Sequence, residues 1–437
     1  MNPLFSRRAV LGALGAAAAL GAAPALGQTY LAENVPRIDR FRWAWLRSQL
    51  VLEPGLTWID TASFGPTLRA VLVRSYRYVE QQSADFRTFE SLQGAGSAGE
   101  RAALADAARF LGCDAGELVV TEGARTGLAL VAAGLDLEAG DEVLVTLHDH
   151  PAAVYPWLAQ ARRRGIRVVE APETLDAAST PEAIVQRLGA ALTPRTRVLC
   201  LPHVQHCHGA VLPVRELCAL ARSRGVFTVV DGALAAGHVD LNLGELGCDA
   251  YAMGVDRWLN GPLDVGLLYV RGEAQARLWP ALPDRPDGWS GVDRFNLPLA
   301  PAPPAWAASA RFGHGRVHRG PAVAAMPLAF ELQNAVSRPL MQARLRALAQ
   351  QLRAGLQRIP GVEVVTPAHP ALHAGIVSVR IPGRSPATIV DTVAREDRIV
   401  LGRVTHGSGF DAVRISVHPA NDPIDVDRAV AAVQRHV

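Results

Sequence analysis

The chain has 437 residues, of which 49% are hydrophobic and 19% are charged, and its formal net charge is +3. This composition is that of an ordinary globular protein with two or three domains, or with one large α/β domain and a smaller one, and it excludes a disordered or low-complexity chain. Because the net charge is small and the basic residues are scattered, the sequence argues against a nucleic-acid partner.

Two residue types carry further information. All 44 basic residues are arginine, so the chain contains no lysine. A GC-rich coding sequence accounts for most of these arginines, but it does not account for a position that requires an amine nucleophile, because a guanidinium stays protonated. The five cysteines form no CxxC pair and lie mostly in apolar runs, which favours buried free thiols over disulfides. They are Cys113, Cys200, Cys207, Cys218 and Cys248.

The first residues, MNPLFSRRAVLGALGAAAALGAAPALGQ, are predicted to be a targeting segment and not part of the fold. Ser6, Arg7 and Arg8 precede an apolar run and resemble a twin-arginine export signal, and cleavage at small residues would remove residues 1–27. The apolar run is too short and too weakly apolar for a stable membrane anchor, although an uncleaved signal anchor is the alternative. The mature protein is therefore predicted to be periplasmic or otherwise extracytoplasmic.

After a linker-like stretch over residues 28–55, apolar runs rich in β-branched residues alternate with helical stretches. This alternation predicts an α/β fold with a mostly parallel sheet that is covered by helices on both faces. The predicted strands are 117–122, 142–148, 166–171, 197–204, 227–233 and 265–270, and helices are predicted over 124–135, 151–165 and 213–225. Residues 253–262, MGVDRWLNGP, follow the apolar stretch 248–252 and are predicted to form a polar turn between two strands.

A Pro-rich stretch over residues 297–308 marks a change in the pattern. Predicted helices over 329–336 and 341–359 are followed by shorter predicted strands over 362–367, 376–382 and 412–418. This order predicts a smaller C-terminal α+β domain. We place the large domain, with its N-terminal segment, at residues 28–315 and the small domain at residues 316–437.

Candidate site residues follow the predicted strands, and ligands of a parallel sheet bind beyond the carboxyl ends of its strands. Residues 121–126, TEGART, join a strand to a helix start and form either an anion site or an ordinary turn. His148, Asp149 and His150 follow the next strand. Asp231 ends another strand, where its carboxylate either points into the cleft or caps a helix.

Taken together, these stretches resemble the aminotransferase class V family, the pyridoxal-phosphate (PLP) proteins that include cysteine desulfurases and isopenicillin N epimerase-like proteins. The resemblance implies a PLP-transferase-like fold with a three-layer large domain, and a homodimer whose active site lies at the subunit boundary. It is carried by WIDTASFGP at 58–66, by residues 123–157, by HVQHCHGAVLPVREL at 203–217, by residues 230–262 and by VRISVHPAND at 413–422.

Several roles in the family carry over to matching residues. By this resemblance His150 corresponds to the ring that stacks on the pyridine of PLP, and Asp231 to the carboxylate that pairs with the pyridine nitrogen. Arg414 corresponds to the arginine that binds a substrate carboxylate, a role that suits its two-pronged donor geometry. The phosphate-side turn corresponds to Gly123, Ala124 and Arg125.

The segment MGVDRW departs from the family pattern. Where the family has a serine, a histidine and the Schiff-base lysine, this chain has Gly254, Asp256 and Arg257. A carboxylate at Asp256 would repel a phosphate by about 4 kcal/mol per charge pair at about 4 Å and an effective dielectric near 20, unless Arg257 neutralises it in part. Because the chain has no lysine, covalent PLP attachment through a lysine amine is excluded. The positions that correspond to the catalytic centre are thus His150, Asp231, Asp256 and Arg257.

Other cofactor contacts differ as well. Leu234 replaces a polar residue that contacts the phenolic oxygen of PLP, and residues 205–209, QHCHG, replace an SNVTG-like run. The segment that matches the neighbouring subunit's phosphate contact reads VHR at 317–319. We take His206 and His318 as candidate cofactor contacts, and His208 as a candidate substrate contact beside Arg414.

Three interpretations follow. We favour a binding protein with a degenerate PLP site that holds an amino-acid- or peptide-like carboxylate. The first alternative is a lysine-independent enzyme of epimerase, lyase or transaminase type that acts on an amino-acid or siderophore-like substrate. Such an enzyme would hold PLP or its amino form without a covalent bond. Its base would be His206, His208, Asp256 or His318. The second is a metal site, whose weak candidate ligands are His148, His206, Cys207 and His208.

Overall fold

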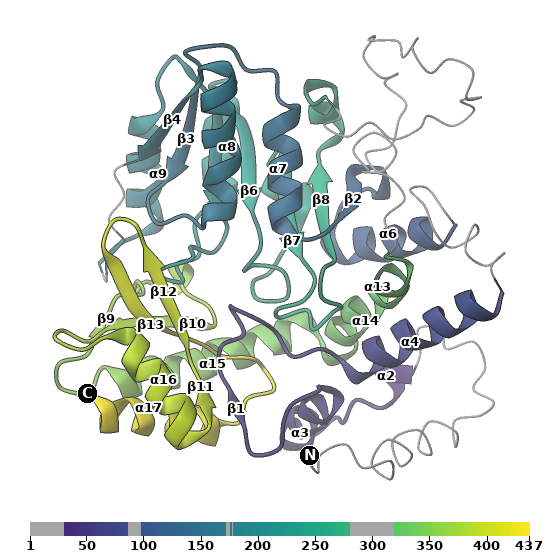
Figure 1. The fold of residues 1–437 in the computed structure, drawn as a ribbon, viewed down its shortest axis with the longest axis vertical. Coiled ribbons are helices and arrows are strands. Elements are labelled where there is room, and N and C mark those ends of the chain that lie inside the picture. Colours follow the sequence, from purple (N-terminus) through teal and green to yellow (C-terminus); the bar gives the residue numbers. More distant parts are fainter. Residues whose placement is uncertain (1–29, 86–97, 172–174, 177, 280–318) are drawn as a thin grey trace, which may run out of the picture.

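The structure is a computed structural model and describes residues 30–85, 98–171, 175–176, 178–279 and 319–437 (Figure 1). The predicted targeting segment at 1–27, the Pro-rich stretch at 297–308 and His318 all lie outside the described residues. Within these ranges no helix is both long enough and apolar enough to cross a bilayer.

A seven-stranded sheet forms the centre of the large domain, in the order β2-β8-β7-β6-β5-β3-β4. Strand β8 runs antiparallel to both of its neighbours, and the other pairings are parallel. The predicted mostly parallel sheet is confirmed. Its strands are β2 (Leu118–Thr121), β3 (Glu142–Thr146), β4 (Arg167–Ala171), β5 (Thr196–Pro202), β6 (Phe227–Asp231), β7 (Ala250–Gly254) and β8 (Gly266–Val270).

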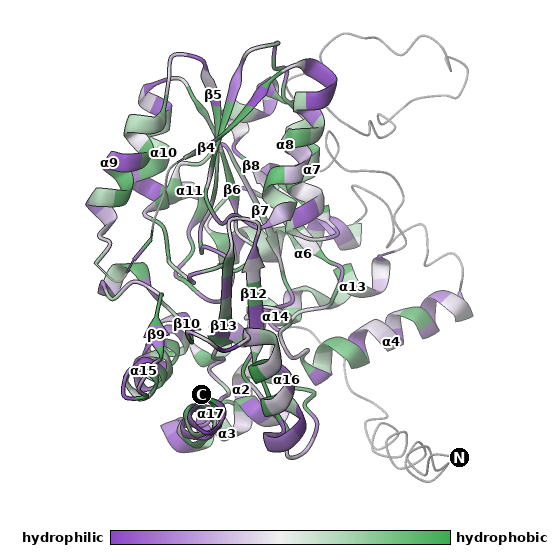
Figure 2. Cartoon of the chain, turned by 60° about the vertical axis from the view of Figure 1, so that its left-hand side comes forward, coloured by the Kyte–Doolittle hydropathy of each residue, from purple (hydrophilic) through white to green (hydrophobic). Residues whose placement is uncertain are grey.

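Helices cover both faces of this sheet, which gives three layers (Figures 1 and 2). Helices α7 (Ala124–Gly134) and α8 (Pro151–Arg164) pack on one face. Helices α9 (Pro181–Ala191), α10 (Val214–Ser223) and α11 (Leu243–Leu246) contribute to a second apolar cluster that also includes α6 (Ala98–Leu111). Figure 2 shows the hydrophobic strands between these layers, as two-sided burial of a parallel sheet requires.

Local sequence explains why α8 begins and ends where it does. The side chain of His150 accepts a hydrogen bond from the amide of Ala152 at the N-terminus, and Pro151 occupies the first helical position, where its missing N–H costs little. Gly165 ends the helix in the left-handed conformation, with a φ of 75°. The helix start therefore fixes His150 at the carboxyl end of the sheet.

A second, four-stranded sheet has the order β12-β13-β10-β9 and is antiparallel throughout. Its strands are β9 (Glu363–Val364), β10 (Ile376–Arg380), β12 (Gly402–His406) and β13 (Phe410–Ser416). Helices α15 (Arg338–Leu356), α16 (Pro386–Asp397) and α17 (Pro423–His436) pack beside it. The remaining elements are α13 (Gly320–Ala325), α14 (Pro327–Val336) and the short 3₁₀ turns Ala115–Glu117, Gly272–Arg277 and Pro370–Leu372.

The N-terminal segment was wrongly predicted to be a linker. It contains helices α2 (Tyr30–Glu33) and α3 (Asp39–Gln49), and α3 forms because it buries Leu46 in an apolar cluster. Strand β1 (Thr57–Trp58) then pairs in parallel with β11 (Ile399–Val400), far along the chain. The segment continues to α4 (Arg69–Ala84), so residues 59–68 cross the molecule between β1 and α4.

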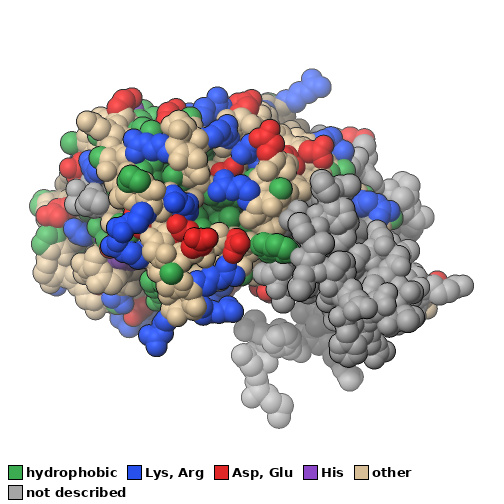
Figure 3. Space-filling model, turned by 90° about the horizontal axis from the view of Figure 1, so that it is seen from above, with side chains coloured by type: hydrophobic (Ala, Val, Ile, Leu, Met, Phe, Trp, Pro, Cys, Tyr) green, Lys and Arg blue, Asp and Glu red, His purple; other side chains and the backbone are tan. Residues whose placement is uncertain are grey.

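The surface agrees with the small net charge. On the face shown in Figure 3, arginine and carboxylate side chains are interspersed and neither charge dominates. A mixed surface of this kind provides no electrostatic track for a polyanion on that face.

Candidate functional site

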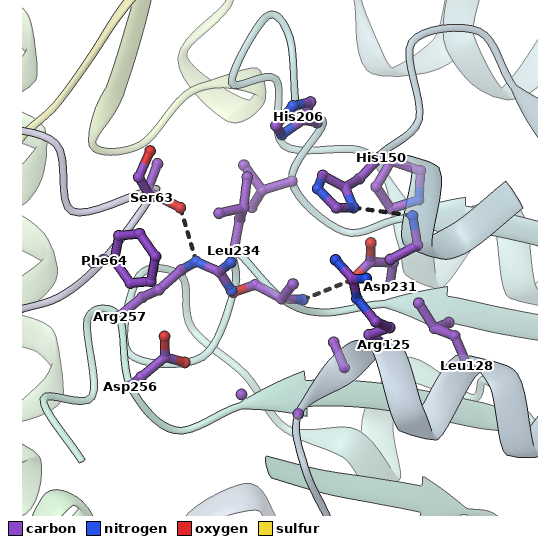
Figure 4. A pocket seen from close by; sticks show the side chains of 18 of the residues that line it. Ser63, Phe64, Arg125, Leu128, His150, His206, Asp231, Leu234, Asp256 and Arg257 are labelled. Carbon is purple, nitrogen blue, oxygen red and sulfur yellow. Dashed lines mark hydrogen bonds between the residues drawn. The ribbon is translucent and has the colours of Figure 1, made fainter. Parts of the chain in front are cut away.

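A cavity of about 390 Å³ lies where the carboxyl ends of the large-sheet strands meet the starts of α7 and α8. The crossing segment 62–64, of which Figure 4 labels Ser63 and Phe64, and Arg414 on β13 also line it. Its lining residues are Ala62, Ser63, Phe64, Glu122, Gly123, Ala124, Arg125, Leu128, His150, Ala152, Pro202, Val204, His206, Asp231, Ala233, Leu234, Gly254, Asp256, Arg257, Leu263, Asp264, Val265 and Arg414.

The segment after β7 is the predicted turn between two strands, but its apolar residues are buried. Trp258 and Leu259 are fully buried, and the Trp258 ring stacks on His238 with a centroid distance of 3.8 Å and an interplanar angle of 4°. Trp258 also donates its indole N–H to the carbonyl of Val417 at 2.8 Å. Apolar anchoring on both sides holds this segment rigidly against the cavity.

Arg257 links two walls of the cavity through backbone oxygens. Its Nε donates to the carbonyl of Ala62 and its Nη1 to the carbonyl of Ala233, both at 2.8 Å. The crossing segment also lies tightly on this turn, because a Cβ at Gly65 would come within 1.8 Å of the Arg257 carbonyl oxygen. The guanidinium thus joins the N-terminal segment to the loop after β6.

Asp256 has no such partners. Within the described part of the chain, its carboxylate forms no hydrogen bond and no ion pair, so the partial neutralisation by Arg257 that the sequence suggested is not observed as an ion pair. A Cβ at Gly254 would lie 2.5 Å from Asp256 Oδ1, which shows that the carboxylate occupies the space a side chain at 254 would need. Asp256 therefore presents an unpaired negative charge to the cavity.

His150 and Asp231 lie on the opposite side of the cavity from Asp256 in Figure 4. Asp231 Oδ1 accepts a hydrogen bond from the amide of Ala233 at 2.9 Å, and burial raises the pKa of its carboxyl. Burial lowers the pKa of His150, whereas the charge of the nearby Asp231 acts to raise it. Since His150 Nδ1 accepts from the amide of Ala152 at 3.1 Å, the proton of the neutral ring resides on Nε2.

Arg414 is 2% exposed and projects from β13 to the cavity. Its Nη2 donates to Ser63 Oγ at 3.0 Å, and its Nη1 lies 3.2 Å from Nδ1 and 3.3 Å from the carbonyl oxygen of His206. Asp60 lies 3.8 Å away, and Arg414 Nε has no hydrogen-bond partner. Burial, with the charge of Arg414, lowers the pKa of His206 to about 2, so this ring is neutral and accepts at Nδ1.

The start of α7 forms the remaining wall. Gly123 precedes the helix with a φ of 131°, a conformation that favours glycine, and it has no side chain with which to cap the helix. Arg125 is exposed and, among the described residues, forms no hydrogen bond or ion pair. Glu122 pairs with Arg319, the one residue of the VHR segment that the structure describes.

The structure brings together most of the residues that the sequence singled out. The cavity is lined by Gly123, Ala124, Arg125, His150, His206, Asp231, Asp256, Arg257 and Arg414.

His208, however, does not line the cavity, contrary to the prediction that it contacts a substrate there. Its ring packs against His148 and Phe410, with centroid distances of 5.1 and 4.7 Å, because the hairpin of β12 and β13 covers it.

The metal candidates do not form a coordination site. Among the described residues, no group of three or more His, Cys, Asp or Glu side chains has an arrangement that could hold a metal ion. His148 and His208 pack edge to face, Cys207 belongs to an apolar cluster with Phe410, and His206 contacts Arg414. The metal interpretation is therefore not carried forward.

Sequence reasoning missed the contribution of the crossing segment. Ser63 accepts a hydrogen bond from Arg414. Phe64 is 60% exposed and lines the cavity. Both residues lie within the stretch WIDTASFGP, but no periodicity indicates where this stretch folds. The rim residues Leu263 and Asp264 follow the buried turn and were missed for the same reason.

Comparison with known proteins adds a family relationship. The chain matches the model of the family described as Aminotransferase class-V over residues 57–429. It is 30% identical over 410 residues to isopenicillin N epimerase of Amycolatopsis lactamdurans, which covers 90% of this chain and 98% of that protein. It is 34% identical over 222 residues to a probable cysteine desulfurase of Pseudomonas putida, over 50% of this chain and 54% of that protein.

Solved structures agree in fold. The complex of the cystine C-S lyase C-DES with its product cysteine persulfide aligns with a TM-score of 0.76 and 24% identity over 87% of this chain and 98% of that one. Another C-DES structure contains glycine covalently linked to its PLP cofactor. A cysteine desulfurase from Escherichia coli aligns with a TM-score of 0.74 and 24% identity over 90% of this chain and 98% of that chain. These neighbours show that the chain has the PLP-dependent transferase fold.

Proposed function

Since this chain belongs to the aminotransferase class-V family, over residues 57–429, we propose that it is a non-catalytic member that binds an amino-acid- or peptide-like carboxylate in the cavity. The family is PLP-dependent, and the fold is that of its enzymes. The proposal rests on one observation above all, which is that a buried arginine faces a cavity in a chain that has no lysine.

The cavity fits a cofactor such as PLP only in part. Asp231 and His150 lie near each other in the cavity wall (Figure 4), and a carboxylate beside a ring is suited to hold an aromatic nitrogen heterocycle. No lysine amine is available for covalent attachment, and the guanidinium of Arg257 donates to two carbonyl oxygens. Asp256 adds an unpaired negative charge to the same cavity, which opposes a phosphate. The residues present therefore do not fit an anchored PLP, and we derive no reaction step through it.

The carboxylate end of the ligand is assigned to Arg414. A guanidinium presents parallel N–H donors that match the geometry of a carboxylate, and burial strengthens such a charge-assisted pair. Ser63 and His206 hold the guanidinium in place from two sides. Asp60, at 3.8 Å, partly balances its charge, so that Arg414 stays buried without a bound ligand.

The proposal is tested by calorimetric titration of the protein with L-norleucine and with L-norleucinamide, which lacks the carboxylate charge. We expect measurable binding of L-norleucine, with binding of the amide weaker by at least about tenfold, because a charged hydrogen bond contributes roughly 1.5–3 kcal/mol. Arg414→Gln should remove this discrimination. The variant Ser63→Ala keeps the charge and should retain it in reduced form, which separates loss of the charge from loss of fold.

A second measurement separates binding from catalysis. After incubation with PLP and reduction with borohydride, the mass of the intact protein should be unchanged. A stable cofactor absorbance band after dialysis, without a covalent adduct, would favour the lysine-independent enzyme over the binding protein, and a covalent adduct would contradict both.

We also propose that the protein is exported through the twin-arginine route and acts outside the cytoplasm. The support is the Ser6-Arg7-Arg8 sequence and the short apolar run that follows it. Fractionation of cells that express the full chain, compared with cells that express an Arg7→Gln and Arg8→Gln variant, tests this proposal. The paired arginines are expected to be required for export.

A homodimer is proposed as the functional unit. Helix α4 carries exposed apolar side chains at Leu72, Tyr76 and Val79, which share one face of the helix. In Figures 1 and 2 this helix lies at the edge of the molecule. An exposed apolar stripe of this kind is typical of an association surface, and the family relationship favours a second copy of this chain as its occupant.

A further inference from the structure

We propose that Asp256 makes the cavity selective for carboxylate ligands that carry a second, cationic group at some distance from the carboxylate, such as basic amino acids and peptides that contain them. This inference rests on the proposed function and specifies the ligand class of the same site.

The first observation is the state of the Asp256 carboxylate. It lines the cavity and occupies the space above Gly254, where a side chain at position 254 would otherwise lie. No cation neutralises it among the described residues. The adjacent Arg257 is hydrogen-bonded to the carbonyls of Ala62 and Ala233. Of the other carboxylates that line the cavity, Glu122 pairs with Arg319 and Asp231 accepts a hydrogen bond from the amide of Ala233, while Asp264 is exposed at the rim. Asp256 is thus the half-buried carboxylate beside Phe64 whose charge is open to a ligand.

The second observation is an aromatic ring in the same wall. Phe64 is 60% exposed and lines the cavity, and Figure 4 shows it on the same side as Asp256. Its backbone is fixed, because its carbonyl accepts the indole N–H of Trp58 at 2.9 Å and its amide donates to the carbonyl of Asp60 at 3.3 Å. An aromatic face beside a carboxylate is a suitable environment for an alkylammonium group, which gains from both the charge and the ring.

The third observation is that the cavity has an opposite pole. Arg414 is buried in the wall and is held by Ser63 and His206, both of which also line the cavity. A ligand that spans the cavity therefore meets a guanidinium at one position and a carboxylate with an aromatic ring at another. An anionic second group is disfavoured at Asp256 by like-charge repulsion, and an apolar one leaves this carboxylate unpaired.

The inference is tested with L-lysine and L-norleucine, which share the carboxylate, the α-ammonium group and the alkyl chain. They differ by the terminal ammonium group of lysine. Calorimetric titration of the full-length protein should give about tenfold tighter binding of L-lysine, from the combined contributions of a partly exposed charge pair and a cation–π contact. Asp256→Asn should reduce the difference severalfold by weakening L-lysine binding, because the charge pair is lost and only the contact with Phe64 remains.

A matched control makes the same chemical change elsewhere. Asp391 is exposed on α16 and does not line the cavity, so Asp391→Asn should preserve the preference for L-lysine. Phe64→Leu should reduce the preference without abolishing it. Circular dichroism of each variant checks that the fold is retained.

The outcomes separate the inference from the proposed function. Equal binding of L-lysine and L-norleucine to the wild-type protein, or a preference that is undiminished by Asp256→Asn in a folded variant, would overturn the role of Asp256. Binding of neither amino acid contradicts the carboxylate-binding function itself.

Discussion

Arg257 occupies the turn after β7 as a structural link between two backbone oxygens. Its guanidinium donates to the carbonyls of Ala62 and Ala233 through two different nitrogens. A lysine has a single nitrogen and does not reproduce this geometry. The residue therefore has a use in this fold that is independent of any cofactor. Its presence is not explained by codon bias alone.

The first prediction concerns Arg257→Lys. We expect this variant to form no covalent adduct with PLP after borohydride reduction, because the unpaired carboxylate of Asp256 still opposes the phosphate. Loss of one charge-assisted hydrogen bond should lower the free energy of unfolding by about 1–3 kcal/mol. Intact-mass spectrometry and denaturant titration measure the two effects.

The control for this prediction is a triple variant, Gly254→Ser with Asp256→His and Arg257→Lys, which restores the family pattern. The three changes belong together, because a side chain at 254 needs the space that Asp256 now fills. An adduct in the triple variant alone would support the argument. An adduct in Arg257→Lys alone would show that the phosphate side is intact.

At the scale of elements, the crossing segment 59–68 is the least local part of the site. It is held by Arg257 on one side, by the parallel pairing of β1 with β11 and by the hydrogen bond from the Leu68 amide to the carbonyl of Asn260 at 3.0 Å. Gly65 allows the closest approach, since any side chain there would overlap the Arg257 carbonyl.

The second prediction follows from that approach. Gly65→Ala should lower the free energy of unfolding by about 2–4 kcal/mol, because the backbone has to move to accommodate the added methyl group. It should also weaken L-norleucine binding, since Ser63 moves with the segment. Gly407→Ala is the control, because a Cβ at Gly407 meets no atom within 4 Å. Equal stability of the two variants in denaturant titration would contradict the packing described here.

Different elements of the site were predictable to different degrees. Asp231, His150 and Gly123 follow strands whose apolar, β-branched character is local, so the sequence places them at the carboxyl edge of the sheet. Strand β8 has the same composition as its neighbours, and nothing in it indicates its antiparallel direction. The crossing segment depends on pairing between Thr57 and Ile399, and such distant contacts leave no periodic pattern in a single sequence. The burial of Trp258 was missed because flanking polar residues resemble an exposed turn.

At the scale of the whole molecule, three buried histidines join distant parts of the chain. His238 contacts the Gly375 amide, His418 contacts Asn260, and His203 contacts Tyr251. Burial lowers the pKa of His203 and of His238 to about 4, and that of His418 to about 3. These rings are therefore neutral in the folded protein at physiological pH.

The third prediction is that stability falls as the pH decreases from 6.5 to 5. In this window the unfolded chain binds protons at these histidines, whose ordinary pKa is about 6.5, and the folded chain does not, so acid favours unfolding. These three groups alone should give a slope on the order of 2–4 kcal/mol per pH unit. Burial also lowers the pKa of His148, His150, His206, His208 and His373, which adds to the slope in the same direction. Denaturant titration at several pH values measures it.

Other groups oppose this slope. Burial raises the pKa of Asp60 and of Asp231, so as the pH decreases these carboxyls bind protons in the folded state before they do so in the unfolded state. This proton binding stabilises the folded state in acid. The histidines should outweigh them because the unfolded histidines titrate within the window itself. His418→Gln should reduce the slope by about 1 kcal/mol per pH unit, which is the contribution of one such histidine. A slope that is flat, or that has the opposite sign, would count against the buried neutral histidines.

The fourth prediction concerns assembly. Light scattering of the purified protein should give about twice the mass of the single chain, which is 46.5 kDa for all 437 residues. Tyr76→Asp should shift the protein to monomer, because it places a charge in the apolar stripe of α4. Tyr155→Asp is the matched control, since Tyr155 is 65% and Tyr76 is 64% exposed but Tyr155 lies on α8. Monomeric wild-type protein, or an equal effect of both substitutions, would argue against a dimer through α4.

The pairing of β1 with β11 also has a consequence for biosynthesis. Thr57 leaves the ribosome well before its partner Ile399 and the cavity residue Arg414. A nascent chain that is still being elongated consequently has an incomplete binding site and an unpaired strand near its start. Ligand capture becomes possible only after Arg414 has been translated and has folded onto the crossing segment.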